Sequence, residues 1–396
     1  MDNADLEVVI ETVRELVRDR VIPREAEIDE TDAMPPGLRD EAARMGLFGF
    51  AIPEEYGGLG LTMSQEVRLV MELGYTTPAF RSMFGTNNGI AGHVLLEGGT
   101  EEQKKLYLPK LASGEWTAAF ALTEEDAGSD PAGLSTSVAA APDGGWVVNG
   151  LKRFITNAPV ADVFMVFARH ADGPAAGKIS VLMVPAGTQG VTVGPRDGKM
   201  GQHGAWTSEV RFDDVRTPGG YGGSSPRDST AGETLIGTPG EGYVTAMRCL
   251  AHGRLHIAAL CVGLAQRALD ETISYALSRR QGGQPIAEYQ LIQGLIADSQ
   301  TDVMAGRALV LAAAADFDSG ADRRLGPSCA KYFCSEMVGR VTDRAVQVHG
   351  GAGYMRGVPV ERFYRDARLF RIYEGTSQIQ QLVIARQALA ATRRRM

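Results

Sequence analysis

One glutamate near the end of the chain has the type and the setting of a residue that could act as a base. Glu374 lies in the run RIYEGTSQ, beside an aromatic residue and just before Gly375, which interrupts helical structure. Thr376 or Ser377 can N-cap the apolar-periodic helix that follows, so Glu374 is predicted on a short loop that can direct it into a cavity. Partial removal from water can raise the pKa of a carboxylate enough for base chemistry near neutral pH. On this segment alone, an interaction with the positive end of that helix is an alternative explanation.

Three other segments could bind a cofactor or a substrate. Residues 120–130, FALTEEDAGSD, combine small and hydroxyl residues that expose backbone N–H groups, which suits a ring edge or a phosphate, although a polar loop would look similar. Residues 154–157, FITN, are predicted to end a strand and to place an aromatic ring near a hydroxyl. Residues 349–354, HGGAGY, allow close backbone approach after a helix, but no strand precedes them and no βαβ unit follows, so they are no dinucleotide fingerprint.

Two histidines have the spacing of metal ligands on a helix. His252 and His256 are related by i, i+4, but no glutamate follows His252 and no third ligand is evident, so a buried or capping role is favoured over a metal site. The four cysteines lie in apolar helical stretches without a CxxC pair, which predicts buried thiols in a reducing compartment.

Composition limits the class of protein. The 396 residues carry a formal charge of −8, which argues against a nucleic-acid surface, and 44% of them are hydrophobic, as in ordinary globular proteins. No apolar run approaches the ~20 residues needed to span a bilayer. The acidic start, MDNAD, lacks the basic and apolar parts of a signal peptide. These features predict a cytoplasmic protein that binds neither nucleic acid nor membrane.

The elements that must position these residues fall into three domains. Residues 1–120 are predicted as a helical domain, residues 121–235 as a strand-rich domain, and residues 236–396 as helical again. Long helical segments are expected near 241–279, 288–317, 327–349 and 377–392. Because strands and helices do not alternate, a doubly wound sheet is excluded and a mainly α fold with a central β-domain is predicted.

Local signals refine this division. Leu6 to Val17 form the apolar face of a first helix, and Thr100 with Gln103 is a capping box for another. Asn149-Gly150 is predicted as a hairpin turn. The glycine-rich segment 218–226 is predicted as a solvent-exposed loop.

Five segments, in order along the chain, resemble those of the acyl-CoA dehydrogenase family. They are 47–60 (LFGFAIPEEYGGLG), 122–130, 154–157, 347–354 and 373–378. Any one could arise by chance, but all five in family order and spacing form a specific pattern that covers essentially the whole chain. The resemblance implies a helical N-terminal domain, a β-barrel-like middle domain and a C-terminal four-helix bundle.

The resemblance also implies the chemistry. FAD would lie between the β-domain and the C-terminal helices, with part of its site supplied by a neighbouring subunit of a homotetramer built as a dimer of dimers. Glu374 would take the α-proton of an acyl-CoA, as in fatty acid metabolism, while the β-hydrogen leaves as hydride to flavin N5, giving a trans-2-enoyl-CoA. Electron-transfer flavoprotein would be the acceptor. The implied cofactor contacts are Leu122, Thr123, Phe154, Thr156, Arg279, Gln290, Gln347, Thr376 and Gln378. The implied substrate contacts are Ser129, Arg254, Tyr373 and Gly375.

Some members carry the base one residue before the arginine that matches Arg254; this chain has Gly253 there, which leaves Glu374 as the base that the pattern offers. The chain departs from the family pattern at two places. Gly282 stands where an aromatic residue is usual in a cross-subunit FAD contact, and the segment 218–237 is longer than usual. Three alternatives stay open: a dehydrogenase acting on a carrier-protein thioester, an enoyl-thioester reductase of secondary metabolism, and a catalytically silent FAD-binding subunit.

Overall fold

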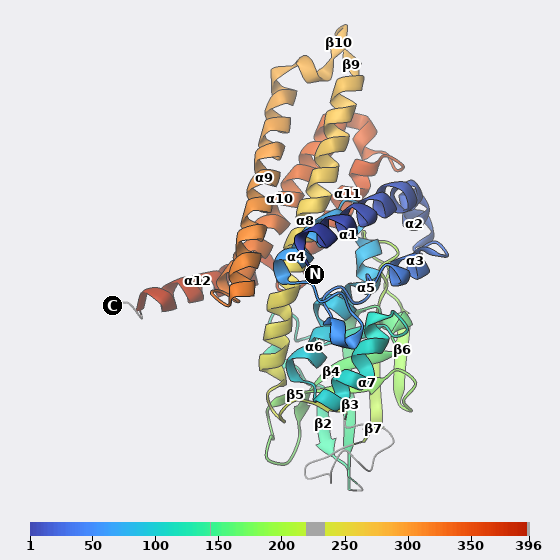
Figure 1. Cartoon of the computed structure of the whole chain (residues 1–396), viewed down its shortest axis with the longest axis vertical. Coiled ribbons are helices and arrows are strands. Elements are labelled where there is room, and N and C mark those ends of the chain that lie inside the picture. Colours follow the sequence, from blue (N-terminus) through green and yellow to red (C-terminus); the bar gives the residue numbers. More distant parts are fainter. Residues whose placement is uncertain (143, 219–233, 394–396) are drawn as a thin grey trace.

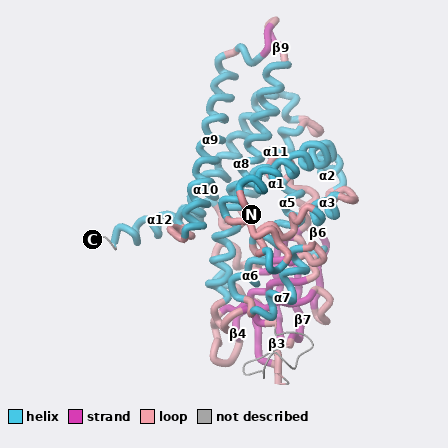
Figure 2. Tube along the Cα trace, viewed as in Figure 1, coloured by secondary structure: helices cyan, strands magenta, loops and turns pink. Residues whose placement is uncertain are grey.

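The computed structural model describes residues 1–142, 144–218 and 234–393 (Figure 1). Helices occupy both ends of the chain, and most of the strands gather in the lower half of the molecule, with the short β9 at the opposite end, as Figure 2 shows. The predicted mainly α fold with a central β-domain is confirmed. The predicted loop at 218–226 falls, beyond residue 218, on residues that lie outside the described part of the chain.

The N-terminal helices form because their apolar residues recur on one face. Leu6, Ile10, Val13 and Leu16 are buried along the first helix, and the Asp2 carboxylate caps its start by accepting from the N–H of Ala4 at 2.8 Å. The predicted capping box of Thr100 and Gln103 is confirmed. These helices are α1 (Asn3–Leu16), α2 (Glu25–Thr31), α3 (Leu38–Arg44), α4 (Met63–Leu73), α5 (Pro78–Gly89), α6 (Ala91–Gly98) and α7 (Glu101–Ala112).

The middle part is an eight-stranded sheet. Its strands are β1 (Ala118–Ala121), β2 (Ser137–Ala140), β3 (Trp146–Thr156), β4 (Val163–His170), β5 (Ile179–Pro185), β6 (Val191–Arg196), β7 (Thr207–Thr217) and β8 (Leu235–Ile236). The order is β6-β7-β3-β2-β4-β5-β8, with β1 pairing parallel to β4. β4 and β5 are buried along nearly their whole length, so apolar residues on both faces of the sheet are covered.

The predicted hairpin at Asn149-Gly150 is wrong. Strand β3 continues through both residues, and the pairing with β7 shifts register there, as in a bulge. Asn149 exchanges hydrogen bonds with Asp214 of β7, and a Cβ at Gly150 would lie 2.3 Å from the hydroxyl of Thr136. The glycine therefore serves close packing inside a sheet, where the local sequence resembled a turn.

The C-terminal part is built on three long helices that run side by side. They are α8 (Gly242–Ser278), α9 (Gln290–Ser319) and α10 (Leu325–His349), close to the predicted segments. A two-stranded ribbon, β9 (Arg280–Gln281) and β10 (Gln284–Pro285), joins α8 to α9 at the end away from the sheet (Figure 1). The short α11 (Pro359–Ala367) follows α10. The last helix, α12 (Ser377–Arg393), bonds to α10 through Ser377 and then extends away from the body (Figure 1).

Two glycines let α4 approach α8 closely. A Cβ at Gly263 of α8 would lie 2.2 Å from the carbonyl oxygen of Met71, and one at Gly74 would lie 2.6 Å from that of Leu260. Larger residues at either position would push the helices apart. The close crossing brings the polar side chain of Glu66, on α4, against α8.

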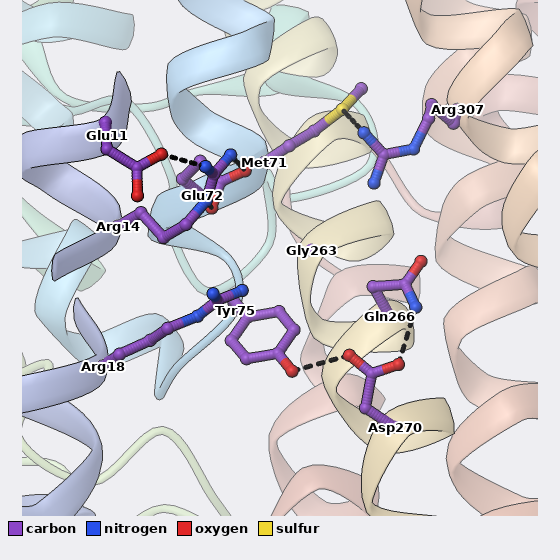
Figure 3. A pocket seen from close by; sticks show the side chains of 10 residues that line it. All are labelled: Glu11, Arg14, Arg18, Met71, Glu72, Tyr75, Gly263, Gln266, Asp270 and Arg307. Atoms are coloured by element: carbon purple, nitrogen blue, oxygen red, sulfur yellow. Dashed lines mark hydrogen bonds and ion pairs between the residues drawn. The ribbon is translucent and has the colours of Figure 1, made fainter. Parts of the chain in front are cut away.

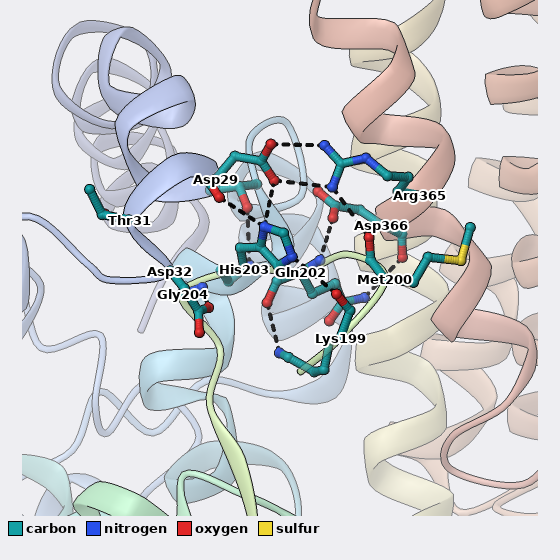
Figure 4. Close-up of polar contacts among 12 residues, drawn as sticks. Asp29, Thr31, Asp32, Lys199, Met200, Gln202, His203, Gly204, Arg365 and Asp366 are labelled. Atoms are coloured by element: carbon teal, nitrogen blue, oxygen red, sulfur yellow. Dashed lines mark hydrogen bonds and ion pairs between the residues drawn. The ribbon is translucent and has the colours of Figure 1, made fainter. Parts of the chain in front are cut away.

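The segment between β6 and β7 connects the three parts of the chain (Figure 4). The N–H of Gln202 donates to Asp366 of α11, and the N–H of Gly204 donates to Asp32 at the end of α2, at 2.6 Å. One short loop therefore holds the sheet, the first helices and the C-terminal helices together. No helix among the described residues is both long enough and apolar enough to cross a membrane.

Candidate active site

The loop that carries Glu374 is held in a strained conformation. It connects the 3-10 turn Arg368–Arg371 to α12, and both Glu374 and Gly375 are left-handed, with φ of +52° and +89°. A left-handed glutamate persists only where its surroundings enforce it. Here the buried amide of Gln380 donates to the carbonyl of Glu374 at 3.0 Å, and the ammonium of Lys331 donates to that of Gly375 at 2.7 Å.

The start of α12 fixes the other end of the loop. The N–H of Ile379 donates to Thr376 Oγ1 at 3.3 Å, so Thr376 is the capping residue of the two that were predicted. Ser377 Oγ donates instead to Glu336 of α10 at 2.5 Å. Glu374 therefore lies on a short loop before a helix, as its sequence predicted, and Gln378 is exposed in the first turn of that helix.

The carboxylate of Glu374 points at α8. A Cβ at Gly253 would lie only 2.4 Å from Glu374 Oε2. That oxygen is buried and accepts no hydrogen bond from any described residue. Burial raises the pKa of Glu374, while the charges of Arg81, Lys331 and Arg254 oppose this rise. A buried carboxylate oxygen with a free lone pair is poised to accept a proton.

Three of the four predicted substrate residues meet at this carboxylate. Tyr373 and Gly375 flank it in the chain, and Arg254 follows Gly253 on α8, where it is buried. Ser129 lies on the exposed segment after β1, so the carboxylate and Ser129 are on different parts of the molecule.

The predicted cofactor positions of the sheet lie together at one end of β3. The N–H of Arg153 donates to the carbonyl of Thr123 at 2.9 Å, which places Leu122 and Thr123 beside Phe154. The ring of Phe154 is 59% exposed, unusually high for an aromatic residue, and its backbone is left-handed with φ of +57°. The strand ends at Thr156, as predicted.

Polar anchors that the sequence did not reveal hold these positions. The buried Lys152 donates to the carbonyl of Leu122 at 3.1 Å and pairs with Glu124 at 2.8 Å. Asn157 donates to the carbonyl of Ser82 and to the hydroxyl of Thr86, both at 2.9 Å, which fixes the end of β3 against α5. The exposed Phe154 is therefore presented near the helix that carries Arg81.

The remaining predicted cofactor residues lie far away in the same chain. Arg279 follows Gly253 by 26 residues, or about 39 Å along a helix. It lines a pocket of ≈ 390 Å³ with Tyr275, Gln281, Ile286 and the turn Val348–Ala352. Gln347 precedes that turn and Gln290 begins α9, both exposed. One chain does not bring the two groups of predicted cofactor residues together.

A second pocket, of ≈ 370 Å³, lies between α1, α4, α8 and α9 (Figure 3). Its walls are tied by the ion pair of Arg14 with Glu72 at 3.0 Å and by the hydrogen bond of Tyr75 with Asp270 at 2.6 Å. It contains none of the predicted site residues, so it is separate from the carboxylate of Glu374.

The two histidines on α8 gain a third polar partner from α4. Ligand atoms of Glu66, His252 and His256 lie within 4.8 Å of one another, and Glu66 is the residue that the sequence pattern did not reveal. However, Arg81 Nη2 donates to His256 Nδ1 at 2.8 Å, so the hydrogen of His256 is on Nε2, which donates to Glu66 at 2.5 Å. That tautomer has no Nε2 lone pair for a metal, so the cluster fits a chain of hydrogen bonds better than a metal site.

Comparisons with known proteins point to one family. Family models described as the acyl-CoA dehydrogenase N-terminal, middle and C-terminal domains match residues 3–115, 119–215 and 240–389. The chain is 36% identical over 379 residues to the 3-(aryl)acrylate reductase of Clostridium sporogenes, covering 95% of this chain and 97% of that protein. It is 38% identical over 359 residues to the CarC subunit of the caffeyl-CoA reductase-Etf complex of Acetobacterium woodii, covering 91% of each. The solved structure of butyryl-CoA dehydrogenase from Megasphaera elsdenii matches with a TM-score of 0.90 and 31% identity, covering 98% of this chain and 99% of that chain.

Proposed function

The chain belongs to the acyl-CoA dehydrogenase family, and we propose that it converts an acyl-CoA thioester to its trans-2-enoyl-CoA with Glu374 as the α-proton base. Members of this family are oxidoreductases that bind FAD. One observation carries the assignment of the base: Glu374 Oε2 is buried, unpaired and surrounded by cations on neighbouring helices.

The residues around Glu374 suit removal of a weakly acidic proton. Arg81, Lys331 and Arg254 favour the ionised carboxylate, because each places positive charge near it. The backbone N–H of Glu374 donates to no described residue, so it is free to stabilise negative charge that develops on a thioester carbonyl. Bound FAD would supply the acceptor for the β-hydride.

The cofactor would be held by two groups of residues from different chains. Leu122, Thr123, Phe154 and Thr156 would contact the flavin, and the exposed Phe154 ring leaves an apolar surface for it to cover. Arg279, Gln290 and Gln347 would reach the cofactor of a second copy, because about 39 Å of α8 separates Arg279 from the base of its own chain. Thr376 and Gln378 would add contacts beside the base.

Exposed apolar side chains support the proposed homotetramer. Leu291 and Met304 on α9 are 86% and 63% exposed, and Leu382 and Leu389 on the projecting α12 are also exposed. Apolar surface of this kind is usually covered in an assembly. A dimer of dimers would cover it and would also complete the FAD site.

Two relatives favour the reverse reaction as a second candidate function. The Clostridium and Acetobacterium proteins are named as reductases, and the latter as a subunit of an Etf complex. The same carboxylate, once protonated, would donate the α-proton during reduction of an enoyl thioester, so the site suits either direction. Electron-transfer flavoprotein would then be the redox partner in both directions.

The deciding experiment is anaerobic titration of the purified protein with short, medium, long and branched acyl-CoAs, following the visible flavin band. We expect one class to bleach the flavin. Glu374→Gln should still bind FAD and ligand but reduce the flavin about 10²–10⁴-fold more slowly, because the positioned base is lost. Glu336→Gln, which removes a carboxylate of α10 but keeps an acceptor for Ser377, should bleach at a rate near that of the wild type.

Three results would contradict the proposed dehydrogenation by Glu374. Wild-type rates in Glu374→Gln would refute the base. A yellow protein that enoyl-CoAs oxidise after chemical reduction, but that no acyl-CoA bleaches, would support the reductase. A yellow protein inert to both would support a silent FAD-binding subunit.

A further inference from the structure

A buried polar chain next to the base has no role in the reaction as proposed above. Glu66, His256 and Arg81 are 4%, 0% and 7% exposed and are joined in that order by hydrogen bonds. His252 Nε2 lies 3.2 Å from the same Glu66 oxygen and supports it from the other side. Burying four such groups is costly unless each is satisfied, so the chain needs an explanation beyond packing.

The guanidinium at the end of this chain is fixed along α5. A Cβ at Gly85 would lie 2.5 Å from Arg81 Nη1, and one at Gly89 would lie 3.3 Å from Nη2, so two missing side chains make its groove. Its hydrogen bond to His256 then sets where Nη2 points. Within the described chain it makes no ion pair with Glu374, although it is the cation with the largest effect on the pKa of that carboxylate.

Among the described residues, each cation near Glu374 is bound to an acceptor other than that carboxylate. Lys331 donates to the carbonyl of Gly375, and Arg254 Nη1 lies 3.5 Å from Ser328 Oγ. The charged and titratable groups that face Glu374, from α5, α8, α10 and its own loop, are Arg81, His252, Arg254, Lys331 and Tyr373. The carboxylate thus stays unpaired in a positive environment.

We propose that Glu66, His252 and His256 are positioning residues that hold Arg81 where it favours ionised Glu374 without forming an ion pair with it. The inference rests on the proposed role of Glu374 as the base. Without the cation, a buried carboxylate would be protonated and unable to accept a proton. In direct contact with the cation, its lone pairs would be engaged and it would be a weaker base.

The pH dependence of flavin reduction distinguishes loss of the cation from direct pairing of the cation with Glu374. The acid limb is the pH range in which the rate falls as Glu374 becomes protonated. Arg81→Gln removes the cation, so the pKa of Glu374 rises and the acid limb moves to higher pH. His256→Leu frees Arg81 to pair with Glu374, so the acid limb moves to lower pH and the high-pH plateau falls by about ten-fold or more. Glu66→Gln, which weakens the anchor but keeps an acceptor, should give a smaller shift in the same direction as His256→Leu.

A double variant and a matched control complete the test. In Arg81→Gln protein, Glu66→Gln should move the acid limb no further, because the residue that it positions is gone. Glu25→Gln removes another buried glutamate, which bonds to Arg362 at 2.5 Å, and should cost stability without moving the limb.

Four outcomes would overturn the proposal. The positioning role alone would be refuted if His256→Leu and Glu66→Gln shifted the acid limb no more than Glu25→Gln does. It would also be refuted if they shifted the limb in the same direction as Arg81→Gln. A stoichiometric metal ion that His252→Asn removes would assign the cluster to a metal instead. A wild type that no acyl-CoA reduces would remove the proposed function and this inference together.

Discussion

The position of Glu374, the proposed base, depends on the absence of a side chain at position 253. A Cβ there would lie 2.4 Å from Glu374 Oε2 and 2.9 Å from Ile90 Cγ2, and neither distance is tolerated. The carboxylate therefore fills the space that the glycine leaves. Because its loop is already left-handed, it has little freedom to move aside without giving up the hydrogen bonds of Gln380 and Lys331.

We expect Gly253→Ala to keep its fold and its flavin but to lose flavin reduction by about 10- to 100-fold, because the base is displaced from its productive position. Stopped-flow reduction by the acyl-CoA that bleaches the wild type would measure this. Gly294→Ala on α9, where a Cβ meets nothing within 4 Å, is the matched control and should reduce at the wild-type rate. Equal rates in the two variants would contradict the steric argument.

At the scale of elements, the loop between β6 and β7 holds the sheet to α2 and α11. One of its partners is the buried carboxyl group of Asp366. Asp366 on α11 accepts from Gln202, but its second oxygen is buried without a partner in the described structure. Burial raises the pKa of Asp366 to about 6. The folded protein therefore binds this proton more tightly than the unfolded chain does.

The contribution of Asp366 to stability is present below its unfolded pKa and is lost as the pH rises through its folded value of about 6. We expect Asp366→Asn to unfold like the wild type near pH 4 and to be more stable at pH 7, by up to about 3 kcal/mol. Thermal unfolding at several pH values would measure this.

Asp322→Asn offers a comparison of opposite sign. Backbone N–H groups at the start of α10 bond to Asp322 and lower its pKa against the effect of burial. Its contribution is present at neutral pH and lost on acidification, so Asp322→Asn should destabilise most at pH 7. Parallel pH profiles for the two variants would contradict this account of Asp366.

At the scale of the whole molecule, the length of α8 places Arg279 about 39 Å from the position of Glu374, so one chain cannot bring both to the proposed cofactor site. We expect Arg279→Ala to lose FAD on dilution while its fold is kept, because its charge would bind the cofactor of a second copy. Flavin absorbance and native mass, measured together, would test this. Arg280→Ala is the control, since Arg280 donates to Gly283 of its own turn at 2.8 Å. Unchanged flavin occupancy in Arg279→Ala would count against the cross-subunit role.

What could be predicted from the sequence was local. The helix face from Leu6 to Leu16 and the capping box of Thr100 depend on residues within a few positions of one another, and both predictions are confirmed. An N-cap at Thr376 or Ser377 was likewise predicted, and Thr376 is the one that caps. Asn149-Gly150 was predicted wrongly because its partners are distant in sequence: Thr136 just precedes β2, and Asp214 lies on β7.

The polar residues around Glu374 could not be predicted, because they too come from segments far apart in the sequence. Glu66 meets His256 across 190 residues of sequence, and Arg81 meets it across 175. The spacing of His252 and His256 gave a signal, but it could not indicate which residue of α4 would face them. Tertiary packing of α4 on α8 decides that.

The contact between Glu374 and Gly253 also bears on how such an enzyme could change over generations. In the pattern that the sequence resembles, some members have the base at the position of Gly253, and a side chain there would occupy the space of the Glu374 carboxylate. With Glu374 as the proposed base, a lineage that first gained a side chain at 253 would displace it, and one that first lost Glu374 would pass through an inactive form. Each single change would then be harmful, and only a paired change would exchange one arrangement for the other.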